Sequence, residues 1–96
     1  MKLTPKQRAI LKGLANHIDK RYLVGKGNLD ENIVAMLDKA LEARELIKVG
    51  LLPASSQKSD EIAEELEKKL DCGIVQEIGR VIVIYRKSKL NPKIVI

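Results

Sequence analysis

The order of helix-like and strand-like segments is the feature that most narrowly limits how this chain can fold. Apolar residues at helical spacing predict three helices, and shorter alternating or continuous apolar runs predict four strands. The order is α-β-α-β-α-β-β, with the helices beginning after Thr4, Asp30 and Ser59 and the strands expected near 21–24, 45–52 and on both sides of Gly79-Arg80. Such an alternation excludes an all-helical bundle and an all-β sandwich.

Local signals predict where these elements begin and end. Thr4 with Gln7 forms a capping box, and Pro5 suits the first helical position. Asp30 is the expected N-cap of the second helix, which ends near Arg44. Further expectations are a hydrophobic staple between Leu29 and Val34, an N-cap at Ser59 and a helix stop at Gly73. Each helix should also have a buried apolar stripe: Ile10, Leu11, Leu14 and Ile18 on the first, Ile33, Leu37, Ala40 and Leu41 on the second, and Ile62, Leu66 and Leu70 on the third.

The predicted fold class is α/β in the broad sense, an α+β two-layer domain with a mixed four-stranded sheet. A strand, a helix and a second strand in succession predict a parallel crossover, and the final hairpin adds antiparallel pairing. Ninety-six residues suffice for one such domain, which we place at residues 1–87. Residues 88–96 are expected to form a short basic C-terminal tail.

Charge is distributed unevenly along the chain, which has a net charge of +5. Residues 1–27 carry seven Lys/Arg and one Asp, residues 28–79 carry six Lys/Arg and twelve Asp/Glu, and residues 80–96 carry five Lys/Arg and no acid. If the two ends lie together, they form a positive face that suits a polyanion. Charge alone leaves open an ordinary solvated surface with a basic tail.

The stretch "VGKGNL" at residues 24–29 joins a predicted strand to a predicted helix, where backbone N–H groups can face an anion. A dinucleotide fingerprint is disfavoured, because Asp30 replaces its third glycine and no acid follows the next strand. A Walker A motif is absent. Two interpretations remain open from the residues: a clamp on a nucleic-acid backbone, or glycines that only accommodate a tight turn.

Other chemistry has little support in the sequence. The single cysteine, Cys72, suits a buried apolar position, and the single histidine, His17, has no partner that suggests catalysis. We expect no enzyme activity, no metal site and no cofactor. The absence of a long apolar run predicts no membrane span, and the interrupted N-terminus predicts a cytoplasmic protein. Of the two tyrosines, Tyr85 is expected in the core, so base stacking is at most a minor contribution to binding.

Four separated blocks resemble one known family. They are "LTPKQRAILKGLA", the glycine turn before a helix, "ALEARELIKV" at residues 40–49, and "VQEIGRVIVIYR" at residues 75–86. Together the chain resembles the bacterial stand-alone CRM (chloroplast RNA splicing and ribosome maturation) domains of YhbY type, over about residues 3–86. The resemblance implies a fold similar to the C-terminal domain of translation initiation factor 3, RNA binding, and association with precursors of the large ribosomal subunit.

The resemblance also implies which residues face RNA. The family's GxxG loop corresponds to Gly25, Lys26, Gly27 and Asn28, with Asn28 in place of the second motif glycine and Asp30 where the family often has threonine. The matching basic residues are Lys6, Lys12, Lys26 and Arg86, and charge adds Arg8, Lys20, Arg21, Lys87 and Lys89. The expected function is that of a monomeric ribosome assembly factor that binds ribosomal RNA. The alternative is a small interaction module that docks its basic face on an acidic protein.

Overall fold

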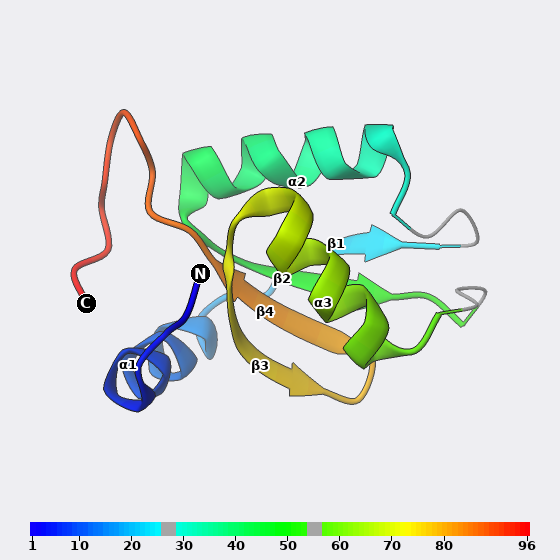
Figure 1. The fold of residues 1–96 in the computed structure, drawn as a ribbon. Helices are drawn as coiled ribbons and strands as arrows, with labels where there is room; N and C mark the ends of the chain where they lie inside the picture. The colour runs from blue at the N-terminus through cyan, green and yellow to red at the C-terminus, as the bar shows by residue number, and fades with distance from the viewer. Residues whose placement is uncertain (26–28, 54–56) are drawn as a thin grey trace.

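The computed structural model describes residues 1–25, 29–53 and 57–96, which contain three helices and four strands (Figure 1). The α-β-α-β-α-β-β order expected from the sequence is confirmed. The elements are α1 (Pro5–Ala15), β1 (Arg21–Val24), α2 (Glu31–Arg44), β2 (Leu46–Leu51), α3 (Ser59–Leu70), β3 (Gly73–Ile78) and β4 (Val81–Tyr85).

The four strands form one mixed sheet in the order β1-β2-β4-β3. Strand β1 runs parallel to β2, with Tyr22 opposite Val49, whereas β4 is antiparallel to both of its neighbours. The register between β3 and β4 shifts by one residue between Ile74 and Gln76. The expected mixed sheet is therefore confirmed, with β1 and β3 as its edge strands.

Helices cover both faces of this sheet. Alternate residues of β4 belong to different cores: Ile82 and Ile84 pack with residues of α2 and α3, while Val83 and Tyr85 pack with residues of α1. The larger core thus lies between the sheet and the α2–α3 pair. Helix α1 adds a second, smaller core on the opposite face.

Most of the local signals act as predicted. The capping box is present, because Gln7 N donates to Thr4 Oγ1 at 3.1 Å and Thr4 N donates to Gln7 Oε1 at 3.0 Å. Asp30 caps α2 by accepting from Ile33 N at 2.8 Å. Gly79 adopts a φ of 57° in the β3–β4 hairpin, a conformation that favours glycine.

The buried face of α1 differs from the predicted stripe. Leu11 and Ala15 are its buried residues, whereas Ile10 and Leu14 are 40% and 41% exposed. The prediction that Ile10 and Leu14 face the core is wrong. The reason is that α1 packs on β2 and β3 without a second helix beside it, so only a narrow strip of its surface is covered.

The ends of α3 also differ from the prediction. Lys58, not Ser59, occupies the N-cap position, and no side chain makes a capping hydrogen bond there. Helix α3 ends at Leu70, and Asp71 takes the left-handed conformation that Gly73 was expected to supply. Gly73 instead begins β3, where an added Cβ would lie 2.7 Å from the side chain of Leu3. Its missing side chain therefore serves packing.

The two termini lie at the same end of the molecule (Figure 1). Helix α1 and the C-terminal segment, residues 88–96, are at this end, while the described residues Gly25 and Pro53 follow the ends of β1 and β2 on the opposite side. The fold therefore separates Gly25 from the C-terminal segment along the length of the sheet.

Candidate nucleic-acid interface

Helix α1 presents positive charge without compensating acids. Its charged residues are Lys6, Arg8 and Lys12, and it contains no Asp or Glu. Lys6 and Lys12 are exposed, whereas Arg8 is half-buried and its Nη2 donates to the carbonyl of Leu3 at 3.2 Å. Lys6 and Lys12 are therefore free to contact an external anion, and Arg8 is partly committed to the fold.

The chain between α1 and the glycine turn continues this positive surface. Lys20 and Arg21 are exposed at the start of β1, and Lys20 Nζ lies 4.8 Å from the ring centre of Tyr22. Gly25 follows β1 directly, and a Cβ placed on it would meet Leu52 at 3.3 Å. The predicted loop contacts of Lys26, Gly27 and Asn28 lie outside the described residues.

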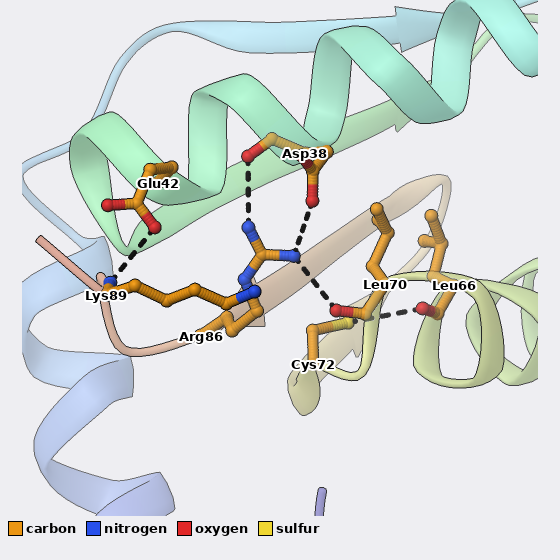
Figure 2. A network of polar contacts seen from close by, with 7 residues as sticks. All are labelled: Asp38, Glu42, Leu66, Leu70, Cys72, Arg86 and Lys89. Carbon is orange, nitrogen blue, oxygen red and sulfur yellow. Dashed lines mark hydrogen bonds and ion pairs between the residues drawn. The ribbon is translucent and has the colours of Figure 1, made fainter.

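Arg86 occupies a different environment from the other predicted RNA-facing residues. Its Nη1 donates to Asp38 Oδ1 at 2.8 Å and to the Leu70 carbonyl at 3.0 Å, and its Nη2 donates to the Asp38 carbonyl at 3.1 Å. Figure 2 shows this guanidinium between α2 and α3. The side chain is only 14% exposed. Arg86 therefore joins two helices, and this placement does not support the role at an RNA surface that the sequence suggested.

Two carboxylates of the α2 end hold the C-terminal segment against the domain. Glu45 is fully buried and accepts from the backbone N–H groups of Ser88, Lys93 and Ile94 at 2.8, 2.6 and 2.8 Å. Glu42 accepts from the Ser88 hydroxyl and from the backbone N–H groups of Lys89 and Leu90. Residues 88–94 are thus attached to the domain rather than extending from it.

The sequence analysis assigned no role to Glu42 or Glu45. The one available signal was Glu45 itself, an acid placed between the apolar stripe of α2 and an apolar strand. An acid in that position must be paired or hydrogen-bonded when it is buried. Its partners, however, come from residues more than forty positions away, which local patterns do not reveal.

These contacts set the acidity of both carboxyl groups. Burial opposes ionisation of Glu45, but the hydrogen bonds from Ser88, Ile94 and Lys93 together outweigh it and lower its pKa. For Glu42, hydrogen bonds from the Lys89 backbone, the Ser88 side chain and the Leu90 backbone lower the pKa to about 2. Both carboxylates are therefore ionised at neutral pH and act as acceptors for the C-terminal segment.

The cations at the C-terminal end point to different parts of the surface. Lys87 lines a hollow together with Tyr85 and the last residues of the chain. Lys89 lines another with Asp38, Glu42 and Arg86. The structure therefore places Lys89 apart from the positive surface of α1, although both sites were predicted to face RNA.

The opposite face of the domain is acidic. Helix α3 carries five carboxylates and two lysines, and its ion pairs join Glu64 to Lys68 at 3.6 Å and Glu65 to Lys69 at 3.5 Å. Both pairs join residues four positions apart, which are neighbours on a helix surface. Helices α1 and α3 cover opposite faces of the sheet, but Arg8 of α1 lines one hollow together with Asp60, Glu64 and Glu67 of α3. Arg8 therefore lies beside the acidic surface.

The remaining candidates for chemistry have structural explanations. Cys72 is fully buried, and burial raises the pKa of its thiol to about 11. His17 is exposed just after α1. Within residues 1–25, 29–53 and 57–96, no group of three or more His, Cys, Asp or Glu side chains is arranged to hold a metal ion. None of the helices in these ranges is both long enough and apolar enough to span a bilayer.

Comparison with known proteins matches this architecture to one family. The model of the CRS1 / YhbY (CRM) domain matches residues 3–86. The chain is 41% identical over 92 residues to "Probable RNA-binding protein YqeI" of Bacillus subtilis, and the match covers 96% of each chain. It is 34% identical over 87 residues to an "RNA-binding protein" of Haemophilus influenzae, and that match covers 91% of this chain and 88% of the relative. The solution structure of the hypothetical protein SAV1595 from Staphylococcus aureus superimposes with a TM-score of 0.77 at 45% identity, covering 93% of each chain.

Proposed function

We propose that this chain, which belongs to the CRS1 / YhbY (CRM) domain family, is a non-catalytic RNA-binding protein that contacts phosphates through α1 and the start of β1. One observation carries the proposal: the exposed cations Lys6, Lys12, Lys20 and Arg21 of α1 and the start of β1 share their segment with a single acid, Asp19, and the acidic helix α3 covers the other face of the sheet. The names of the curated relatives support RNA as the polyanion.

The composition of this surface favours binding by charge and shape. Lysine and arginine side chains neutralise phosphates and release counterions, which makes affinity strongly dependent on salt. The surface offers little aromatic area, since the chain has two tyrosines, no phenylalanine and no tryptophan, and Tyr85 is buried. We therefore expect preference for an RNA shape over a sequence, and the carboxylates of α3 orient the protein by repelling RNA from the opposite face.

The target that we propose is ribosomal RNA in a precursor of the large subunit. The function is then that of a cytoplasmic, monomeric assembly factor, with the loop Gly25–Asn28 adding contacts to the RNA backbone. The resemblance to YhbY-type domains supports this target. The positive surface is continuous in sequence with this loop, because Lys20 and Arg21 precede it by a few residues.

A salt titration with paired variants tests RNA binding by α1. We would measure the affinity for a stem-loop RNA between about 50 and 300 mM salt. Lys6→Ala/Lys12→Ala should flatten the plot of log K against log salt by roughly 0.7 to 0.9 per lost phosphate contact. Lys68→Ala/Lys69→Ala removes the same net charge from α3 and should leave the slope almost unchanged. Equal effects of the two pairs would show that only total charge matters and would contradict the proposed face.

Sedimentation separates the proposed target from RNA in general. The protein should sediment with precursors of the large subunit in a low-salt gradient, and it should leave those fractions when nuclease digests the accessible RNA. Crosslinking should then locate the contact on ribosomal RNA. Co-sedimentation with the small subunit alone would contradict the assignment to the large-subunit precursor, while RNA binding itself would stand.

A second candidate function is docking on an acidic protein. The exposed pair Ile10 and Leu14 on α1 favours this alternative, because apolar side chains among cations suit a protein interface better than a phosphate backbone. Ile10→Ser should leave RNA affinity almost unchanged under the RNA proposal. If this variant abolishes co-sedimentation and Lys6→Ala/Lys12→Ala does not, the protein-docking function is supported instead.

A further inference from the structure

A groove at the end of the sheet combines apolar walls, one aromatic ring and three cations. It has a volume of about 580 Å³, which lies within the range of small-molecule and cofactor sites. Three segments distant in sequence build it: residues 14–22, residues 43–47 and residues 93–94. Its walls are formed by Leu14, Ile18, Tyr22, Ala43, Leu46, Ile47 and Ile94, and its cations are Lys20, Arg44 and Lys93.

The charge of this groove sets it apart from the acidic hollows of the domain. None of the described residues that line it is Asp or Glu. By contrast, the hollow between α2 and α3 contains Asp30, Glu31 and Asp38, and the one beside Met1 contains four carboxylates. Three cations without an acid favour a ligand with an anionic group. The apolar walls beside an aromatic ring favour a ligand whose anionic group is attached to a flat, apolar ring system.

The side chains around the groove are positioned for such a ligand. Tyr22 is half-buried, so its ring is fixed by the core yet reachable from the groove. Lys20 Nζ already lies over this ring at 4.8 Å, which shows that the ring face accepts a group from the solvent side. Lys93 Nζ donates to the Ala43 carbonyl at 3.2 Å and covers the carboxyl end of α2, whose partial negative charge would otherwise disfavour an anion.

The wall from the C-terminal segment depends on Glu45. The carboxylate accepts from the backbone N–H groups of Lys93 and Ile94, the two residues of that segment that line the groove. These bonds act together with the Lys93 Nζ–Ala43 carbonyl bond and with the packing of Ile94 on the α1 core to hold both residues at the groove. The carboxylates of α2 thus have a function beyond fixing the chain end, because they complete the groove.

We propose that this groove binds one unpaired nucleotide of the RNA, with its base against Tyr22 and the aliphatic wall and its phosphate beside Lys20, Arg44 and Lys93. The proposal rests on the proposed RNA binding and adds the structural element that is recognised. Shape recognition through the basic surface would then be combined with selection of RNA that carries a bulged or looped-out base. Arg44 and Lys93 join the predicted contacts Lys20 and Arg21 in this interface.

The first test compares two RNAs that differ by one nucleotide. A stem-loop with a single bulged purine should bind more tightly than its fully paired counterpart, with a preference on the order of tenfold from stacking and phosphate contacts. Tyr22→Leu keeps an apolar side chain but removes the aromatic ring, and it should reduce this preference to about one without weakening the paired RNA. Equal affinities for both RNAs in the unmodified protein would overturn the groove proposal and leave the proposed function intact.

A second variant, at the rim of the groove, tests the proposal even if Tyr22→Leu does not fold. Arg44→Gln changes an exposed side chain at the end of α2 and should lower the preference for the bulged RNA several-fold. Lys39→Gln on the same helix is the matched control, because Lys39 is exposed and does not line the groove. An equal effect of the two variants would overturn the assignment of the phosphate to this rim.

A mononucleotide tests the groove without any RNA. Only Tyr22, Tyr85 and His17 contribute aromatic ring signals to the proton NMR spectrum, because the chain lacks Phe and Trp. Millimolar adenosine monophosphate should shift the Tyr22 ring signals and leave those of buried Tyr85 in place, and adenosine without phosphate should bind more weakly. Unchanged Tyr22 signals at 10-fold higher nucleotide concentration would overturn the proposal, even if RNA binds elsewhere.

Discussion

The two basic ends of the chain, residues 1–27 and residues 80–96, carry +6 and +5 but use their cations in different ways. Within the described part of the chain, no hydrogen bond or ion pair engages the side chains of Lys6 and Lys12. At the other end, Arg80 donates to the Leu51 and Leu52 carbonyls, Arg86 joins α2 to α3, and Lys93 covers the end of α2.

The difference teaches that net charge overestimates the charge that a ligand can use. Two of the five cations at the C-terminal end, Arg80 and Arg86, are each held by several carbonyl or carboxylate oxygens of the protein itself, whereas Lys93 donates to one carbonyl and keeps two N–H donors for a phosphate. An arginine bound to several protein acceptors would have to give them up before it could bind a phosphate, at a cost comparable to the bond it gains. The free cations of α1 carry no such cost, which is why we place the interface there.

The largest expected effect comes from releasing the C-terminal end. Glu45→Ala leaves three backbone N–H groups without their acceptor and should lower the free energy of unfolding by about 3 kcal/mol. Amides of residues 88–94 should lose their protection from hydrogen exchange before the rest of the domain. The measurement is urea unfolding followed by circular dichroism, combined with hydrogen exchange.

Glu45→Gly is the matched control for backbone conformation. Glu45 has a φ of 66°, in a region that L residues adopt at a cost of about 1 kcal/mol. The glycine variant should therefore be more stable than Glu45→Ala by about 1 kcal/mol, while its C-terminal segment is equally released. If Glu45→Ala unfolds like the unmodified protein, the carboxylate does not hold the segment and the comparison of the two ends fails.

The next effect concerns Arg86. Arg86→Lys keeps the charge but loses the fork that reaches Asp38 and the Leu70 carbonyl at once, so stability should fall by about 2 kcal/mol. The slope of RNA affinity against salt should stay the same. If the slope of RNA affinity against salt becomes flatter while stability is unchanged, Arg86 contacts RNA after all. The two ends would then use their cations in more similar ways than the fold indicates.

Acid should loosen the C-terminal end selectively. The pKa of Glu42 is about 2 in the folded protein, below its value of about 4.3 in an unfolded chain. Its stabilising contribution is therefore complete above about pH 5 and is lost as the pH falls towards 2. The amide signals of Lys89 and Leu90 should titrate with a midpoint near pH 2 in NMR spectra and should not titrate there in Glu42→Gln. A midpoint near 4.3 would show that Glu42 is not hydrogen-bonded in solution.

The smallest effect separates the two free lysines after β4. Lys87→Ala should reduce the salt slope by up to about one unit, whereas Lys89→Ala should reduce it less, because Lys89 lines a hollow that also contains the carboxylates of Asp38 and Glu42. Both side chains are exposed, so stability should change by no more than about 0.5 kcal/mol. A larger effect of Lys89→Ala would mean that RNA reaches the α2 side of the molecule.

Local signals in the sequence were sufficient for the elements and their order. The capping box at Thr4, the N-cap at Asp30 and the hairpin at Gly79 each depend on residues within a few positions, and each forms as predicted. The end of α3 was mispredicted because a glycine is needed at position 73 for close packing against the distant residue Leu3, not for ending the helix. The exposed side of α1 was missed because helical periodicity does not reveal how much of a helix is covered.

The candidate site was only partly predictable for the same reason. Sequence alone identified the cations of α1 and β1, since an exposed helix face needs no partner to be recognised. It grouped Arg86, Lys87 and Lys89 with them, although these three residues lie in separate surroundings in the fold. The groove went unnoticed because its walls come from three segments that meet only after folding.

The sequence by itself determined the α-β-α-β-α-β-β order, the mixed sheet and the basic, acidic, basic distribution of charge, because periodicity, caps and turns act over a few residues. Tertiary structure alone decided which cations remain free and which bind the protein. It also decided that Glu42 and Glu45 attach the C-terminal segment and so complete a groove beside Tyr22. Burial and hydrogen bonding join residues that are far apart in the chain, so no local pattern carries that information.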